Sequence, residues 1–220
     1  MIKSENGVIE IPAEISHKGV VVQVPEHLEN MALPDPYLLQ MYKDMDERVI
    51  WLDAEIDENS TQIVKQIMRY NHDDRGIDPA ERRPIRLFLD TPGGDVVVMR
   101  SIICAIRMSQ TPVYTINFCK AYSAGCHILA AGHRRFALPG SIVMYHNGQW
   151  AIEGQQDNVK NTQKFFDAVD REVKELFKKH TGLDDKTLKK RGVIDWFMDT
   201  DEALQNHIID RVITSFDEIM

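Results

Sequence analysis

Short apolar segments alternate with helical stretches along the central part of this 220-residue chain, and this alternation restricts the fold more than any other feature. The predicted strands are 49–52, 85–89, 113–118, 135–138 and 142–145, and the predicted helices are 59–70, 95–108 and 123–132. Strands separated by helices of this length indicate βαβ crossovers, so we expect an α/β fold with a mainly parallel sheet.

The N-terminal 45 residues are predicted to be irregular, because four prolines interrupt any long element. These prolines are Pro12, Pro25, Pro34 and Pro36. Residues 19–24 are compatible with a short strand or a flexible hairpin. Farther along, residues 72–84 are predicted to form a charged loop, and the basic cluster Arg82, Arg83 and Arg86 is interpreted as solvent-exposed.

A long helix is predicted over about residues 155–179. Its apolar residues recur at spacings of three and four, which places them on one helix face: Phe166, Val169, Val173, Leu176 and Phe177. Such a stripe is typical of packing within one subunit. Packing against another subunit is the alternative, because the helix is long and polar on its far side.

The net charge of −8 argues against a nucleic-acid or acidic-membrane surface, which would need concentrated Lys and Arg. The cysteines Cys104, Cys119 and Cys126 form no Cys-x-x-Cys pair, and their odd number favours a reducing compartment. We see no apolar signal segment at the N-terminus and no apolar run long enough to cross a bilayer. These features predict a cytoplasmic protein.

The motif Thr91-Pro-Gly-Gly-Asp95 lies between a predicted strand and a predicted helix. Its two glycines allow a sharp turn that leaves bare N–H groups at a helix N-terminus, a geometry that suits a developing anion. It lacks the Gly-Lys-Ser/Thr ending of a phosphate-binding loop. A purely structural turn is the alternative.

The second motif, Ala121-Tyr-Ser-Ala-Gly125, places Ser123 at another strand-to-helix junction. A hydroxyl there lies near the positive end of a helix, and the N–H of Ala124 can help to hold an oxyanion. The motif differs from the Gly-x-Ser-x-Gly turn of α/β-hydrolases at Ala121. An N-cap serine without catalytic activity is the alternative.

An imidazole and a carboxylate complete the candidate set. His146 follows the apolar strand 142–145 and is placed to act as a general base at a cleft. Asp195 lies in an apolar stretch, where a carboxylate needs a partner such as a histidine N–H. Each has an ordinary alternative, a satisfied polar residue for His146 and an N-cap or salt bridge for Asp195.

We expect no metal and no cofactor. Although Cys126, His127 and His133 are close in sequence, the two histidines are expected on different sides of a helix, and no His-Glu-x-x-His motif is present. The methionines Met99, Met108 and Met144 are interpreted as core residues.

Taken together, the ordered segments resemble the proteolytic subunit of the Clp protease. The resemblance runs from about residue 47 to the C-terminus and rests on these segments: Glu47-Arg-Val-Ile-Trp-Leu52, Thr91-Pro-Gly-Gly94, Ala121-Tyr-Ser-Ala-Gly125, Val143-Met-Tyr-His146, His180-Thr-Gly182, Asp195-Trp-Phe-Met198 and Glu202-Ala203. It implies a serine peptidase with Ser123 as nucleophile, His146 as general base and Asp195 as orienting acid. It also implies that the backbone N–H groups of Gly94 and Ala124 form the oxyanion hole.

The resemblance further implies a crotonase-like spiral of βαβ units in a peptidase domain over residues 46–220, with a protruding handle at about 147–180. Residues 1–45 would then be the N-terminal segment with the axial loop. The implied assembly is two stacked heptameric rings that enclose the active sites. Unfolded polypeptides would be supplied by a separate AAA+ unfoldase, since the chain has no Walker motif.

Several positions depart from the family's common pattern, namely Arg86 in the unfoldase-docking region, Trp150 and Ala151 in the handle, and Ile194 beside the acid. They motivate an alternative hypothesis, a non-catalytic or weakly active ring subunit of a mixed complex. A second alternative is an acyl-CoA hydratase or isomerase of the same superfold, which would use the bare N–H groups to polarise a thioester.

Overall fold

The computed structural model describes residues 4–5, 8–9, 22–23, 36–148 and 151–219. The chain divides into two compact units, residues 1–43 and 44–220. In the first unit three short strands form an antiparallel sheet: β1 (Ser4–Glu5), β2 (Val8–Ile9) and β3 (Val22–Gln23). The strand alternative for residues 19–24 therefore holds at Val22–Gln23, while the remainder of that segment lies outside the described residues.

Helix α1 (Pro36–Asp46) corrects the prediction that residues 1–45 are wholly irregular. Pro36 occupies the first helical position, where its missing N–H would have had no intrahelical acceptor and its fixed φ suits a helix. Proline thus starts this helix instead of breaking it. The axial-loop prediction for residues 1–45 lies largely outside the described residues and stays a prediction.

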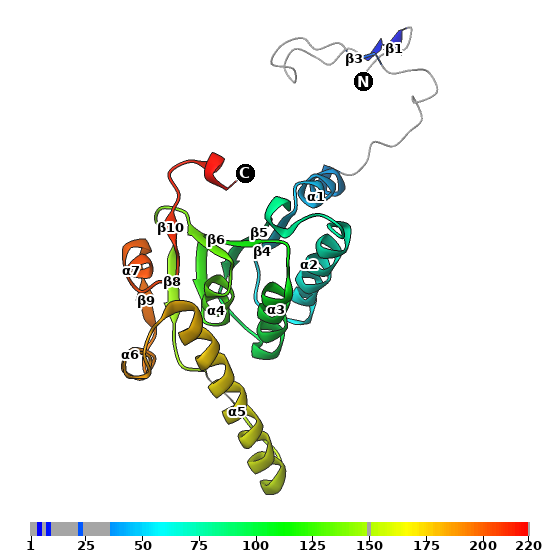
Figure 1. Ribbon diagram of the computed structural model, residues 1–220. Helices are drawn as coiled ribbons and strands as arrows, with labels where there is room; N and C mark the ends of the chain where they lie inside the picture. Colours follow the sequence, from blue (N-terminus) through cyan, green and yellow to red (C-terminus); the bar gives the residue numbers. More distant parts are fainter. Residues whose placement is uncertain (1–3, 6–7, 10–21, 24–35, 149–150, 220) are drawn as a thin grey trace. The chain divides into compact units, whose positions relative to one another are not determined.

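The second unit is built on a parallel sheet in the order β10-β7-β6-β5-β4 (Figure 1). Its strands are β4 (Val49–Leu52), β5 (Ile85–Thr91), β6 (Val113–Tyr122), β7 (Arg134–Ala137) and β10 (Arg211–Val212). The helices that connect the first four of them are α2 (Thr61–Asp73), α3 (Val96–Met108) and α4 (Ala124–Ala130). The predicted α/β fold with βαβ crossovers is confirmed.

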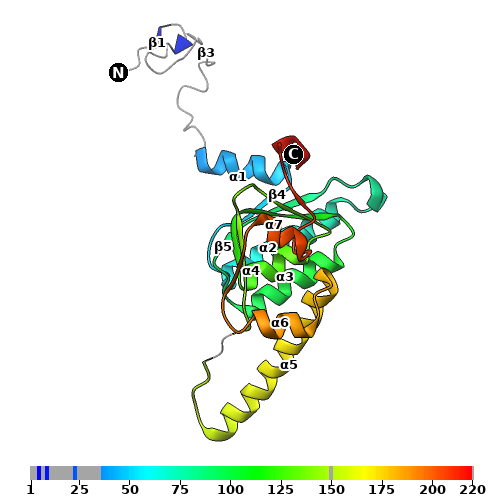
Figure 2. The same cartoon turned by 90° about the vertical axis from the view of Figure 1, so that its left-hand side faces the viewer.

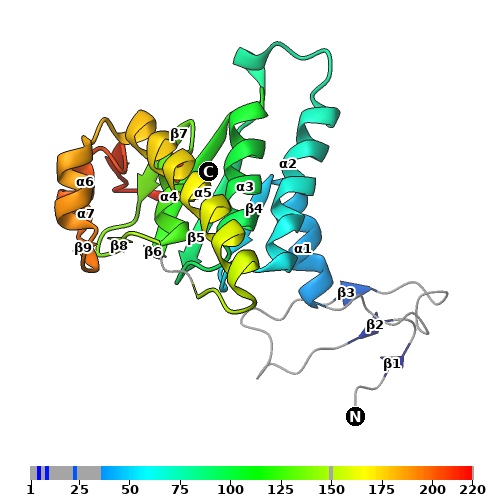
Figure 3. The same ribbon diagram turned by 90° about the horizontal axis from the view of Figure 1, so that it is seen from below.

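The three connecting helices pack side by side on one face of this sheet (Figure 3). They bury the main core, in which Ile67, Leu87 and Ile102 are almost completely inaccessible to solvent. Strand residues of the other parity form a smaller cluster on the opposite face, where the C-terminal residues Ile213 and Ile219 join them. The sheet is therefore covered on both sides, as parallel sheets usually are.

Strand β6 is longer than predicted, and its extra residues position the rest of the fold. Its first part pairs with β5 and β7, whereas Lys120–Tyr122 pairs in parallel with β8 (Ile142–Tyr145). Strand β9 (Trp196–Met198) then pairs with β8 in antiparallel orientation. This smaller extension carries the candidate functional residues.

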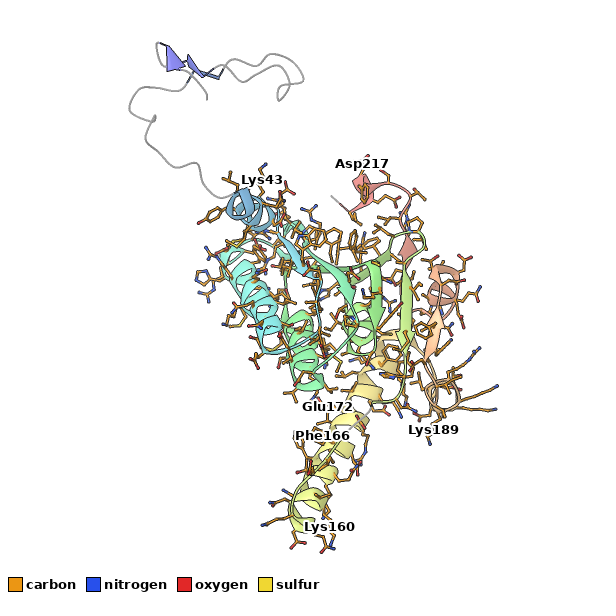
Figure 4. The ribbon with its side chains drawn as sticks, turned by 180° about the vertical axis from the view of Figure 1, so that it is seen from behind. Lys43, Lys160, Phe166, Glu172, Lys189 and Asp217 are labelled. Atoms are coloured by element: carbon orange, nitrogen blue, oxygen red, sulfur yellow. The ribbon has the colours of Figure 1, made fainter. Side chains whose placement is uncertain are left out.

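The predicted long helix is α5 (Gln156–Thr181), and it extends away from the body of its unit (Figures 1 and 2). In Figure 4, Lys160 lies near its far end, followed along the helix by Phe166 and Glu172. Val169, Val173 and Phe177 are buried at the end near the sheet, as the stripe predicted. Phe165, which lies outside that stripe, is 55% exposed.

Shorter elements complete the fold. They are the helices α6 (Asp185–Arg191) and α7 (Thr200–Gln205) and the 3₁₀ turns η2 (Glu58–Ser60), η3 (Pro79–Glu81) and η4 (Phe216–Glu218). Within the described ranges, no helix combines the length and the apolarity that a membrane span requires.

Two interpretations of single residues prove wrong. Arg86 is buried in β5 rather than solvated, and its guanidinium donates hydrogen bonds to the carbonyls of Glu47 and Ile219, which lie far from it in sequence. Met108 is 76% exposed rather than part of the core, whereas Met99 and Met144 are buried as predicted. For Arg86, the local sequence gave no sign of the distant carbonyls that it contacts.

Candidate active site

Ser123 occupies a tight turn between β6 and α4. Its φ of 52° and ψ of −118° lie in a region that L-residues rarely adopt, and such backbone strain persists where the surrounding structure enforces it, often at functional sites. Here the enforcement comes from the sheet, because the Ser123 N–H donates to the Met144 carbonyl at 2.8 Å. The turn therefore presents the Ser123 side chain at the end of β6.

Small residues allow this turn to lie close to the neighbouring loop. A Cβ on Gly93, whose φ is +101°, would lie 2.8 Å from Ser123 Cβ, and a Cβ on Gly125 would lie 2.5 Å from Thr91 Cγ2. Both distances are far below normal contact, so each position needs glycine. The Thr91-to-Asp95 motif and the Ser123 motif, separate in the sequence, thus meet in the fold.

The structure brings Ser123, His146 and Asp195 into one line. His146 Nε2 lies 2.7 Å from Ser123 Oγ, and His146 Nδ1 lies 3.1 Å from Asp195 Oδ1. With the Nδ1 proton donated to Asp195, Nε2 is left to accept the serine proton. This tautomer is the one that a general base requires.

Strand register sets the spacing of these three residues. Tyr122 in β6 lies opposite Met144 in β8, and Tyr145 in β8 lies opposite Trp196 in β9. Each side chain of the line is adjacent in sequence to one of these paired residues. The three groups therefore lie at the same end of the three strands β6, β8 and β9.

The surroundings of Asp195 differ from the prediction. Its side chain is 53% exposed, and the preceding Val193 and Ile194 are 75% and 74% exposed. The apolar residues before Asp195 are thus not buried, although Trp196 after it is, and dehydration is not the reason for the pairing of the half-exposed carboxylate. The carboxylate contacts His146 while one side remains open to water.

Two backbone N–H groups next to Ser123 have no hydrogen-bond acceptor within the described part of the chain, those of Gly94 and Ala124. The N–H groups on either side of Gly94 are occupied, because that of Gly93 donates to Thr91 Oγ1 at 3.2 Å and that of Asp95 donates to the Ile56 carbonyl at 2.8 Å. An ideal Cβ on Gly93 would be 3.2 Å from the Ala124 nitrogen, which shows how closely the loop approaches the start of α4. Bare N–H groups beside a nucleophile can stabilise an oxyanion.

A pocket of about 80 Å³ opens beside Ser123, between α4, α5 and the end of β8. Its apolar wall includes Val96, Met99 and Val173. Polar groups also line it, among them His127, Asn147, Asp170 and Lys174. Sequence analysis missed this pocket. The only available signal was that Asp170, Val173 and Lys174 share one face of the predicted long helix.

Burial controls the other titratable groups near the site. Burial lowers the pKa of His127 to about 4, with a smaller contribution from the nearby imidazole of His146. It raises the pKa of the Cys126 thiol, so that this cysteine is protonated and inert, and it raises the pKa of Tyr145. The Ser123 hydroxyl, by contrast, has the base His146 within hydrogen-bonding distance.

The sequence-adjacent metal candidates have separate environments. His133 Nδ1 accepts a hydrogen bond from the Val113 N–H at 2.9 Å, Cys126 is buried, and His127 lines the pocket. Across the described ranges, no three His, Cys, Asp or Glu side chains are arranged to hold a metal ion.

Comparison with known families gives one match that spans most of the chain. The model of the family described as Clp protease matches residues 36–216. The matched range contains the whole parallel sheet, the serine turn, α5 and the three aligned side chains. The observed mixed α/β architecture agrees with the fold of that family.

Proposed function

The chain belongs to the Clp protease family, whose members are serine-type proteases, and we propose that it is a serine endopeptidase with Ser123 as its nucleophile. His146 would be the general base and Asp195 the group that orients it. The observation that carries the proposal is the continuous line of contacts, 2.7 Å from Ser123 Oγ to His146 Nε2 and 3.1 Å from His146 Nδ1 to Asp195 Oδ1.

The chemistry is acyl transfer in two halves. His146 Nε2 takes the Ser123 proton as Oγ attacks the peptide carbonyl, and Asp195 stabilises the imidazolium that forms. The carbonyl oxygen becomes an oxyanion, which the N–H groups of Gly94 and Ala124 would stabilise. His146 then gives its proton to the leaving amine. In the second half, His146 activates a water that releases the acyl group from Ser123.

We also propose a cytoplasmic, ring-shaped assembly that works with an AAA+ unfoldase. The exposed aromatic side chain of Phe165 on the projecting helix supports contact with other subunits. The absence of a Walker motif in the sequence means that unfolding energy would come from a separate ATPase. The cysteines Cys104, Cys119 and Cys126 are all free thiols, which suits a reducing compartment.

A fluorophosphonate probe, which phosphonylates activated serines, tests the proposal. We expect it to label the wild-type chain and not Ser123→Ala. Ser101→Ala is the matched control, because Ser101 is an exposed helical serine whose hydroxyl bonds to the Val97 carbonyl. The same samples should be sized by light scattering and assayed for peptide cleavage. Assembled wild-type protein that is neither labelled nor active would refute the proposal and favour a non-catalytic ring subunit.

The acyl-CoA alternative predicts a different result. Such an enzyme needs the bare N–H groups to polarise a thioester but does not need a nucleophile. It would bind coenzyme A, and Ser123→Ala would leave its turnover intact. The pairing of Ser123 with His146 favours the peptidase over this alternative.

A further inference from the structure

The pocket beside Ser123 is positioned to receive a substrate side chain. It is bounded by Ser123 and His146 on one side and by α5 on the other. A peptide whose carbonyl is attacked by Ser123 must place the side chain of that same residue within reach of this pocket. The chemistry of the pocket wall therefore bears on which residue is accepted at the cleavage site.

The most informative wall residue is His127. Its ring lies against two aromatic rings, with centroid separations of 4.7 Å to Phe177 and 5.7 Å to Tyr145. Its side chain is partly buried and lines the pocket, yet neither ring nitrogen has a hydrogen-bond partner in the described part of the chain. A neutral imidazole offers one donor and one acceptor. Within the pocket, these two functions remain available to a bound side chain.

The surrounding wall adds polarity without a net charge. Asp170 and Lys174, four residues apart on α5, contribute one acidic and one basic group. Asn147 also lines the pocket, and its Oδ1 is buried without a hydrogen-bond partner among the described residues. Because the wall carries one group of each sign, it favours neither an acidic nor a basic substrate side chain. The uncommitted donor and acceptor of His127 instead favour a neutral side chain that both donates and accepts hydrogen bonds.

The volume sets the size of the occupant. A cavity of roughly 150 Å³ accommodates benzene, whereas this pocket measures about 80 Å³. It therefore suits a slender side chain better than an aromatic ring.

We propose that the pocket selects a slender, uncharged, hydrogen-bonding side chain, of which glutamine is the representative, at the residue whose carbonyl is attacked, and that His127 determines this specificity. The inference depends on the proposed peptidase function. Glutamine can donate to the acceptor nitrogen of His127 and accept from its N–H. An aliphatic side chain of the same length would leave His127 unpaired, as well as losing its own hydrogen bonds.

Two quenched fluorescent peptides that differ only at this residue, glutamine against norleucine, provide the test. Norleucine has nearly the same length and cannot hydrogen-bond. For the wild-type assembly we expect kcat/KM to be about ten-fold higher for the glutamine peptide, the size of effect that one or two paired hydrogen bonds produce. Equal rates, or a preference for norleucine, would overturn the inference.

Variants at His127 locate the cause. We expect His127→Leu to bring the ratio of the two rates close to one or below it, and His127→Gln, which keeps a donor and an acceptor, to retain most of the preference. His72→Leu is the control, because His72 is exposed on α2 outside this pocket, and its ratio should equal that of the wild type. An unchanged ratio in His127→Leu would show that His127 is not the determinant.

A second readout separates this inference from the proposed function. Peptidyl phosphonates that carry the glutamine or the norleucine side chain react with an activated serine, and their inactivation rates should show the same order. If a simple fluorophosphonate labels Ser123 but the two peptidyl probes react equally fast, only the specificity inference fails. If no probe labels Ser123 and neither peptide is cleaved, the peptidase proposal fails and the inference fails with it.

Discussion

Replacing Gly94 by alanine should remove most of the activity while leaving the nucleophile in place. Gly94 has a φ of +142°, and an added Cβ would lie only 2.3 Å from the Ile56 carbonyl oxygen. Ordinary contacts between carbon and oxygen begin at about 3.3 Å, so the backbone must move by roughly 1 Å. Because a useful oxyanion donor lies within about 2.7–3.1 Å of the oxygen, this shift would withdraw the Gly94 N–H.

The expected loss follows from the lost hydrogen bond. Removing one oxyanion donor lowers kcat by about 10²–10³, equivalent to about 2.7–4 kcal/mol of transition-state stabilisation. We expect Gly94→Ala to show this decrease in kcat for peptide hydrolysis at saturating substrate. The backbone strain should also lower the free energy of unfolding by about 1–3 kcal/mol, so thermal unfolding must be followed in parallel.

The chain offers a matched control for the strain alone. Gly140, in the turn between β7 and β8, also has a positive φ, of +81°, but an added Cβ meets no atom within 4 Å. Gly140→Ala should therefore destabilise the fold without lowering kcat. If folded, assembled Gly94→Ala keeps a kcat within about three-fold of Gly140→Ala, the Gly94 N–H is not an oxyanion donor.

Three further predictions concern stability. Arg48→Met should lower the free energy of unfolding by about 3–5 kcal/mol in urea titrations, because it removes the charged partner of the Asp74 carboxylate, which is only 1% exposed and bonded to Arg48 at 2.7 Å. The added change Asp74→Leu should recover part of this loss, and no recovery would argue against a charge effect. Since burial holds the pKa of His127 near 4, well below its ordinary value of 6.5, its neutral form stabilises the fold fully above pH 6.5. This stability, up to about 3 kcal/mol, is lost as the pH falls from 6.5 towards 4, and unfolding curves of His127→Gln should lack that part of the slope. Phe177→Ala should lower the free energy of unfolding by about 3–5 kcal/mol, and with it the melting temperature, because Phe177 is 2% exposed and stacks on Tyr145. A decrease below about 1 kcal/mol would mean that the end of α5 near the sheet is loosely packed.

Local sequence patterns predicted the elements that carry their own periodicity. The run at residues 85–89 is apolar except for the buried Arg86, because β5 is buried on both faces. The helix at 95–108 was predicted one residue early, since Asp95 is its N-cap, with a carboxylate that accepts from the N–H groups of Val97 and Val98. Where the burial pattern or the cap lies within the element itself, the sequence was sufficient to predict that element.

Other elements depend on partners that no local pattern indicates. The polar residues Cys119 and Lys120 hid the second half of β6, which exists because β8 pairs with it. Helix α6 buries only Leu188 and has no apolar stripe to detect. Strand β9 is three residues long and has a single pairing partner, β8.

The candidate site divides in the same way. Ser123, His146 and Asp195 were proposed from residue type, position and family resemblance, and the fold brings them together. Asp195 nevertheless does not lie in a buried apolar stretch, because Val193 and Ile194 before it are exposed and only Trp196 beside it is buried. His127 was considered only as a metal ligand, since the pocket that it lines forms from segments distant in sequence.

The alignment of β6, β8 and β9 has a consequence for how such chains can change. Ser123, His146 and Asp195 each lie next to a paired strand residue, so the pairing of β6 with β8 and of β8 with β9 fixes their separations. The long segment between His146 and Asp195, which includes α5, does not determine these separations. Additions or deletions at the far end of α5 should lengthen or shorten this helix while the distances among the three side chains stay the same. A single residue inserted within β8 would instead turn alternate side chains to the opposite face and separate the groups. Helix α5 is thus free to change in length to suit different neighbours, whereas β6, β8 and β9 tolerate no change in length.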